Sequence, residues 1–407
     1  MEATAAQLPQ GKVRDFQDYL AELDTLLPII EEEAEESERL NYMTDRAMYA
    51  LRDAGMFGML MPRELGGADL PHVEAMQIIE RIAWAHASAG WCTLVNVAVA
   101  PGMALYIPDE GVKEIFGNGP DVMVSGNGVP RGFARRVEGG YMIRGHWAYG
   151  SAITHSDWLH TGCFLTENGQ MVNGPDGGPE VIVAHHRTST VEFKDNWDVL
   201  GLKATGSFDY VLKDGDELFV PDHLCYSTAA ANAKRGDLKA SLGLIGYPAW
   251  AHTSWALGVG RRMLDELVTF ALGKSDAFGK ICDQPVFKFK FAQAEAKFRA
   301  ARALSLQSWQ SIADSFAANK PATTEQLALV KICLRHVHDV ISEVGTFAHR
   351  TARGTSLRDG IMQRLYRDIH SGTQHIILAD QIFETCGRVL LGNYPPDARW
   401  SFFDLDK

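Results

Sequence analysis

The sequence lacks the features that mark several large functional classes. Its six cysteines stand singly, with no CxxC pair and no short-loop pairs of the kind that build disulfide frameworks or zinc sites. We therefore expect reduced, buried thiols in a cytoplasmic protein. The formal net charge of -12, without a Lys/Arg cluster, argues against nucleic-acid binding, because basic residues drive that binding by displacing counterions from phosphates.

Targeting, membrane, metal and dinucleotide signals are also missing. The first ten residues contain no basic segment followed by an apolar run, and no stretch reads as the ~20 apolar residues that span a bilayer. The histidine pairs at 185–186 and 336/338 are not joined by carboxylates at metal-ligand spacing. Gly258 and Gly260 lack the third glycine of a dinucleotide fingerprint. We expect no membrane partner, no metal and no direct NAD(P)H binding.

The pattern of apolar residues predicts helices, then strands, then helices. The protein has 407 residues, 46% of them hydrophobic, which suffice for two or three packed units. Helical periodicity over 15–55 and 71–99 predicts two or three helices before residue 120. Short alternating runs and glycine turns predict a β-domain over 121–225. Periodicity over 242–272, 286–319, 324–349 and 362–391 predicts a bundle of long helices. The predicted domains are thus 1–120, 121–225 and 226–407.

Several phrases, taken in order, resemble the acyl-CoA dehydrogenase superfamily. They are the early helix ending in Pro62-x-x-x-Gly66-Gly67, the hairpin at 140–147, the exit strand at 218–221, the helix at 256–264 and the Arg367-Asp368 phrase. The resemblance implies an α+β fold: an N-terminal helical domain, a central β-barrel or sandwich, and a C-terminal four-helix bundle.

The base expected of an acyl-CoA dehydrogenase is missing. That reaction needs a carboxylate within reach of a weakly acidic C–H group. Family members commonly carry a glutamate shortly after the Arg-Asp phrase, and here Ser371 occupies that position. The alternative location, on the first long C-terminal helix, contains no Asp or Glu between residues 243 and 262.

The same stretch resembles the two-component flavin-dependent monooxygenases of this superfamily. They receive reduced flavin, FAD or FMN, from a separate NAD(P)H-flavin reductase and use O2 through a C4a-hydroperoxyflavin. The resemblance implies that His375 faces the flavin and handles a proton, that the Ser151 hydroxyl binds flavin N5, and that Asn127 lies near the peroxide. Simpler roles stay open: an interhelical histidine for His375, a turn cap for Ser151 and a turn residue for Asn127.

The resemblance also implies a set of cofactor contacts, which are Trp147, Ser151, Ser125, Gly126, Lys203, Thr205 and Ser207. Trp147 is almost as well explained by core packing. Lys203 stands where arginine is commoner, so it keeps the charge but loses bidentate geometry. Relatives hold the cofactor's phosphates across a subunit interface near residues 273–290, which here lack the expected arginine. The choice between FAD and FMN therefore stays open.

The substrate should be electron-rich, because a flavin hydroperoxide delivers an electrophilic oxygen. We expect a small aromatic molecule of the indole, indole-acetate or phenol type. A tentative aromatic-lined pocket consists of Trp91, Asn96, Tyr247, Trp250 and His370, although most of these could be core residues. A homotetramer is expected by analogy. Two alternatives remain, an acyl-CoA dehydrogenase and a non-catalytic family member that acts as a binding protein.

Overall fold

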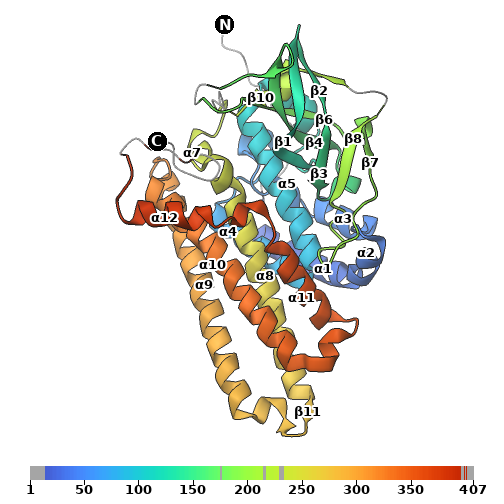
Figure 1. Cartoon of the computed structure of the whole chain (residues 1–407), viewed down its shortest axis with the longest axis vertical. Coiled ribbons are helices and arrows are strands. Elements are labelled where there is room, and N and C mark those ends of the chain that lie inside the picture. The colour runs from blue at the N-terminus through green and yellow to red at the C-terminus, as the bar shows by residue number, and fades with distance from the viewer. Residues whose placement is uncertain are drawn as a thin grey trace. The chain divides into compact units, whose positions relative to one another are not determined.

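The elements follow one another as helices, strands and helices (Figure 1). This computed structural model describes residues 14–174, 177–213, 217–228, 233–395, 398 and 400. Its contacts form two units. The first, called the β-unit here, contains residues 1–70, 95–198 and 203–240; the second, the helical unit, contains 71–94, 199–202 and 241–407. This division follows contacts, so the predicted boundaries at residues 120 and 225 stay a prediction.

The helices before residue 120 are more numerous than predicted. Six α-helices are present between Phe16 and Phe116, and they are α1 Phe16–Glu32, α2 Ala34–Leu40, α3 Asp45–Asp53, α4 His72–Ala85, α5 Ala87–Tyr106 and α6 Asp109–Phe116. The prediction of two or three helices was wrong because short breaks interrupt both periodic stretches. Asn41 ends α2 at φ 60°, and His86 separates α4 from α5 with an extended backbone at φ -153°.

Helix α5 corrects the expectation about membrane-spanning stretches. In the described part of the chain this one helix is long and apolar enough to cross a bilayer by length and composition. Its apolar part is 78% buried inside the protein. Burial of that extent is also found in core helices of soluble proteins.

The β-unit contains two sheets. The larger has the order β10-β6-β4-β1-β2-β9, and β5 pairs with β4; its strands are β1 Val124–Val137, β2 Gly140–Arg144, β4 Trp158–Glu167, β5 Gln170–Met171, β6 Val181–Arg187, β9 Leu218–Pro221 and β10 Cys225–Ser227. The smaller has the order β3-β8-β7, with β3 His146–Gly150, β7 Val191–Phe193 and β8 Phe208–Leu212. Gly139, at φ 77°, closes a β1–β2 hairpin. The hairpin expected at 140–147 is not formed, because β2 and β3 belong to different sheets.

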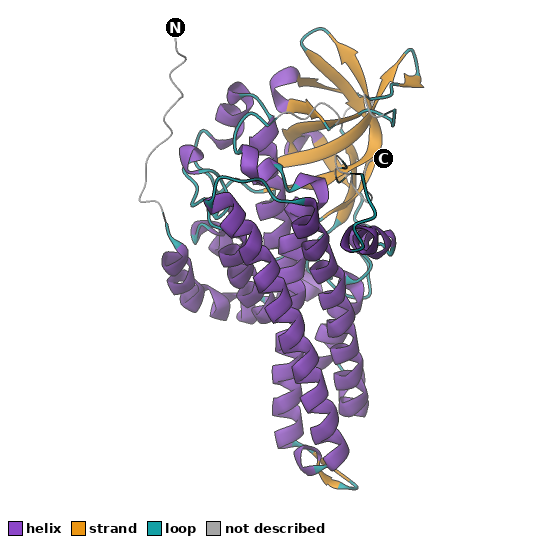
Figure 2. Cartoon of the chain, turned by 90° about the vertical axis from the view of Figure 1, so that its left-hand side faces the viewer, coloured by secondary structure: helices purple, strands orange, loops and turns teal. Residues whose placement is uncertain are grey.

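The helical unit is built on three long helices, α8 Gly243–Gly273, α9 Pro285–Ala317 and α10 Thr324–Ala352 (Figure 2). Their bounds agree with the predicted periodic stretches. Thr323 starts α10 with a capping box to Gln326. Pro285 stands in the first turn of α9, where the N–H that proline lacks would have no partner within the helix.

The fourth long helix, predicted over 362–391, is instead two helices. They are α11 Ile361–Gly372 and α12 Gln381–Leu390. Between them His375 adopts an extended backbone conformation, and its ring accepts a hydrogen bond from the backbone N–H of Ile377. The sequence predicted one helix because the apolar spacing continues across this break.

Candidate active site

Three of the predicted cofactor contacts form a chain of hydroxyl groups in the β-unit. Ser151 Oγ lies 2.6 Å from Ser207 Oγ, which lies 2.7 Å from Thr205 Oγ1. Thr205 is 0% exposed, Ser207 3% and Ser151 7%, so Ser151 is the end of the chain nearest to solvent. The sequence predicted these residues as separate contacts, and the fold joins them.

The backbone around these hydroxyls is unusual. Tyr149 and Ala152, on either side of Ser151, have φ of 64° and 61°, in a region that residues with a Cβ seldom adopt. The N–H of Ala152 donates to the carbonyl of Thr205 over 2.8 Å, which ties the two loops together. Such conformations persist where the surrounding structure enforces them, and they cluster at functional sites.

Asn127 lies at an irregularity of β1, where its register with β4 shifts. Its amide nitrogen donates to the carbonyl of Ala148 over 2.9 Å, and its amide oxygen accepts from the N–H of Val129 over 2.9 Å. The amide nitrogen and the amide oxygen are therefore both hydrogen-bonded to backbone groups, which favours a structural role. The proposed contact with oxygen stays a prediction.

Trp147 lies in the core of the β-unit. It is 0% exposed, its indole N–H donates to the Gly162 carbonyl over 2.8 Å, and its ring stacks on Tyr210 at 5.6 Å between centroids. This placement favours the core-packing alternative over a contact with a flavin face.

Lys203 is half-buried.

Ser125 and Gly126 belong to β1, and Ser125 is 0% exposed. Among the described residues the Ser125 hydroxyl has no hydrogen-bond partner. A buried polar group without a partner is unfavourable unless something else binds it. A flavin ring edge carries carbonyl and N–H groups, so Ser125, together with the Ser151 hydroxyl, fits the expected cofactor.

His375 and Trp91 come together in the helical unit. Their ring centroids lie 5.8 Å apart in an edge-on arrangement. His375 keeps an exposed surface, yet protein atoms crowd its imidazole, and the resulting desolvation lowers the pKa to about 4. Nδ1 accepts the Ile377 N–H, so the neutral ring carries its proton on Nε2, which has no hydrogen-bond partner among the described residues. His375 is therefore a neutral hydrogen-bond donor at pH 7.

His252 of α8 was not predicted from the sequence. Its ring lies 4.5 Å from His375 and 4.9 Å from Trp91, and it is 4% exposed. Burial, with His375 and His338 nearby, holds its pKa well below the usual value. A histidine inside the apolar stretch 249–259, three positions before Trp255, was the available signal.

The contacts of the other predicted pocket residues are as follows. Asn96, on the β-unit's part of α5, accepts the Val124 N–H over 2.7 Å. Trp250 is 0% exposed and packs edge-on against His72. His370 contacts Tyr366 at 4.5 Å between ring centroids, and no ring contact joins it to His375 in the described structure. The side chain of Tyr247 lies outside the described residues.

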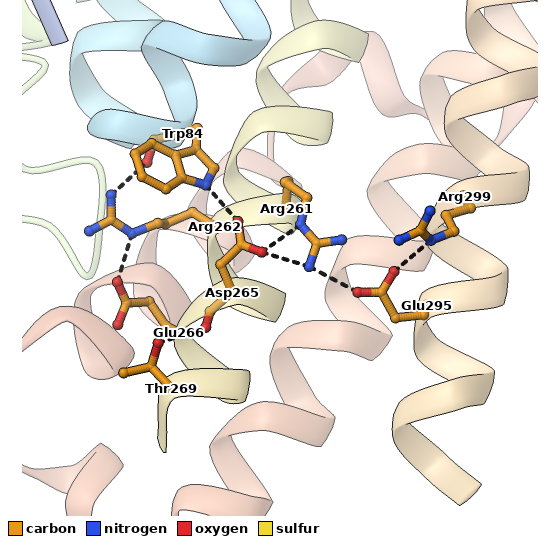
Figure 3. Close-up of polar contacts among 8 residues, drawn as sticks. All are labelled: Trp84, Arg261, Arg262, Asp265, Glu266, Thr269, Glu295 and Arg299. Atoms are coloured by element: carbon orange, nitrogen blue, oxygen red, sulfur yellow. Dashed lines mark hydrogen bonds and ion pairs between the residues drawn. The ribbon is translucent and has the colours of Figure 1, made fainter. Parts of the chain in front are cut away.

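The first carboxylates of α8, Asp265 and Glu266, are held in ion pairs (Figure 3). Asp265 accepts from Arg261 and from the indole N–H of Trp84, and Glu266 accepts from Arg262. Neither is placed as a free base. In the described structure no carboxylate forms a hydrogen bond or ion pair with His375 either. Beside Trp91 the helical unit thus offers an imidazole as the proton donor.

A cavity of about 670 Å³ lies away from these residues, between α9, α10 and the hairpin that begins at Ser275. Four of its lining side chains are basic, and they are Lys290, Lys297, Arg350 and Arg353. Arg353 lies 3.5 Å from Asp276, within the segment 273–290 that lacks an arginine of its own. The sequence could not predict that α10 and the turn after it bring arginines to this segment.

Comparisons with known proteins agree with this architecture. The family model for the acyl-CoA dehydrogenase N-terminal domain matches residues 19–114, and the model for an acyl-CoA dehydrogenase C-terminal domain matches residues 250–380. An indole-3-acetate monooxygenase from Acinetobacter baumannii is 27% identical over 389 residues, covering 93% of this chain and 96% of the relative.

Solved structures give the same result. The HsaA monooxygenase from M. tuberculosis matches with a TM-score of 0.80 at 25% identity, covering 94% of this chain and 99% of that chain. XiaF from Streptomyces sp., in complex with FADH2 and glycerol, matches with a TM-score of 0.82 at 19% identity, covering 95% and 98%. The predicted fold class is confirmed. The chain belongs to the acyl-CoA dehydrogenase superfamily and is an oxygenase component among its two-component flavin-dependent monooxygenases.

Proposed function

We propose that the protein hydroxylates a small, electron-rich aromatic substrate of the indole, indole-acetate or phenol type. It would use O2 and reduced flavin delivered by a separate NAD(P)H-dependent reductase. The observation that carries this proposal is His375, a neutral imidazole with a free Nε2–H that lies edge-on to Trp91 and has no carboxylate bonded to it in the described structure.

The chain's own residues would bind and orient the reactants. When bound, a reduced flavin supplies the electrons that activate dioxygen. The hydroxyl of Ser151 would hold the flavin at N5, and the Nε2–H of His375 would donate a hydrogen bond to an oxygen atom. Trp91 presents an aromatic ring that is 7% exposed, and edge-on packing of this kind suits a planar aromatic substrate. The indole-acetate class is preferred because a relative that matches over nearly its full length carries that name.

The proposal is tested by stopped-flow mixing of the protein and anaerobically reduced FMN or FAD with oxygenated buffer. We expect a transient near-ultraviolet absorption band from a flavin–oxygen adduct, followed by indole-acetate or phenol hydroxylation. Direct reoxidation without this band, for both flavins, would contradict the proposal. Bleaching of bound oxidised flavin by acyl-CoA would support the dehydrogenase instead.

Replacement of Ser151 by alanine should shorten the lifetime of the adduct at least tenfold, because it removes a hydroxyl that holds the N5 proton; a single such bond is worth about 1 to 3 kcal/mol. The matched control is Ser156→Ala, since Ser156 is 7% exposed and donates to the Ala152 carbonyl in the same turn. An equal effect of both substitutions would remove Ser151 from the mechanism.

A further inference from the structure

The hydroxyl chain Ser151–Ser207–Thr205 can carry its hydrogen bonds in two directions. Each hydroxyl has one proton to donate and two lone pairs to accept. At 2.6 and 2.7 Å, either atom of each pair could be the donor. Because Ser207 has one proton for two neighbours, donation to Ser151 leaves it to accept from Thr205, and donation to Thr205 leaves it to accept from Ser151.

The hydroxyl chain is more deeply buried at one end than at the other. Thr205 is 0% exposed, and its backbone is fixed by a bridge to Tyr42 and by the hydrogen bond from Ala152. Ser151, at the other end, keeps the larger exposed fraction. A ligand would therefore contact the chain through Ser151, while Ser207 acts behind it.

Flavin N5 needs opposite partners in its two redox states. In oxidised flavin N5 is a hydrogen-bond acceptor, and in fully reduced flavin it carries a proton and donates. We propose that Ser207 is a positioning residue that lets the Ser151 hydroxyl reverse its direction, so that Ser151 donates to oxidised N5 and accepts from reduced N5. This inference rests on the proposed function, because it takes flavin as the ligand at Ser151. It replaces the expectation that Ser207 itself touches the flavin.

Removal of the Ser207 hydroxyl should lower the affinity for reduced flavin more than the affinity for oxidised flavin. When Ser151 donates to oxidised N5, it does not need Ser207 as an acceptor. When Ser151 accepts from reduced N5–H, its own proton points to Ser207 Oγ over 2.6 Å. Ser207→Ala removes that acceptor, so affinity for reduced flavin should fall about tenfold, while affinity for oxidised flavin should stay within about twofold.

The experiment measures dissociation constants of oxidised and, under anaerobic conditions, reduced FMN and FAD for the full-length protein. The variants are Ser207→Ala, Ser207→Thr, Thr205→Val and the control Ser156→Ala. We expect Ser207→Thr, which keeps the hydroxyl, and Ser156→Ala to behave as the wild type. Thr205→Val should show the same selectivity more weakly, because it removes the acceptor for the Ser207 proton. A tenfold selective loss also lowers the two-electron potential of bound flavin by about 30 mV.

A second measurement reports on N5 itself. With flavin labelled with 15N at N5, the Ser207→Ala substitution should shift the NMR signal of the reduced bound form and leave that of the oxidised form in place. Equal losses in both states, or no loss in either, would overturn the inference while the wild type still binds flavin and hydroxylates substrate. If the wild type binds neither form of flavin, the proposed function fails as well.

Discussion

His375 shows how an ordinary residue acquires a defined chemical state. Its sequence context predicted a histidine inside a long helix, and nothing in it specifies the tautomer. The backbone N–H of Ile377 occupies Nδ1, and the rings of Trp91 and His252 crowd the imidazole. The neutral Nε2–H form follows from these contacts.

The titration of His375 tests that description. Because desolvation lowers its pKa from 6.5 to about 4, the ring should stay neutral as pH falls from 8 to 5 and take up a proton only below that. NMR of protein with 13C-labelled histidine, with His375→Asn to identify the signal, measures this directly. A midpoint near 6.5 would show that solvent reaches the ring freely.

The residues that could be predicted from the sequence are those that belong to a single motif. Ser151, Thr205 and Ser207 were named from phrases that resemble known relatives, and the fold joins them. His252 was missed because its contact with His375 links positions more than a hundred residues apart. For Trp147 the motif indicated a cofactor contact, with core packing as the alternative, and the fold buries this residue in the core.

At the scale of elements, the contact between α8 and α11 brings His375 near His252. Gly372, the last residue of α11, packs against the ring of Trp255 on α8, and a Cβ at position 372 would lie 2.1 Å from that ring. Trp255 is 0% exposed and donates its indole N–H to the Ala87 carbonyl, so it cannot easily move away. Glycine is therefore required by close approach and not by φ.

Substitution of Gly372 by alanine should destabilise the protein by about 1 to 3 kcal/mol, the usual effect of overpacking a core. Urea unfolding followed by circular dichroism measures the change. Gly387→Ala is the matched control: Gly387 also lies in a helix, α12, but a Cβ there meets no atom within 4 Å. The control should be neutral or more stable by about 0.5 to 1 kcal/mol. Equal effects at both positions would contradict the packing account.

At the scale of the whole molecule, buried histidines are a shared feature. Six of the described histidines are at most 4% exposed, and burial shifts the pKa of five of them, which are His86, His185, His186, His252 and His338. Burial lowers the pKa of each, to about 3 for His86 and about 4 for His186 and His338. For His185 and His252 the pKa lies well below 6.5.

These histidines predict acid lability with a defined sign. From about pH 7.5 upward they are almost entirely neutral in the folded and unfolded states, so they contribute almost no pH dependence there. Below 6.5 the unfolded chain binds protons that the folded protein excludes, and stability falls until the folded pKa values are reached. Each buried histidine contributes up to about 1.4 kcal/mol per pH unit.

Urea unfolding at pH 7.5, 6.5, 5.5 and 5.0 measures this dependence. We expect a modest decrease between the first two values, because the unfolded histidines are half protonated at pH 6.5, and a steep decline below. His86→Leu should make the decline shallower, because both ring nitrogens of His86 are buried without a partner in the described structure. Stability that is constant down to pH 5.0 would show that the histidines are solvated.

The expected homotetramer stays a prediction.

The sequence alone determined the order of helices and strands, the superfamily and the missing base, because each depends on local periodicity or on residues in one motif. Only the tertiary structure decided which polar groups meet. The hydroxyl chain, the His252–His375 contact and the break between α11 and α12 each depend on residues that the fold brings together or on a single capping contact. Apolar spacing carries no information about such pairings, since the same pattern is compatible with many arrangements of neighbouring elements.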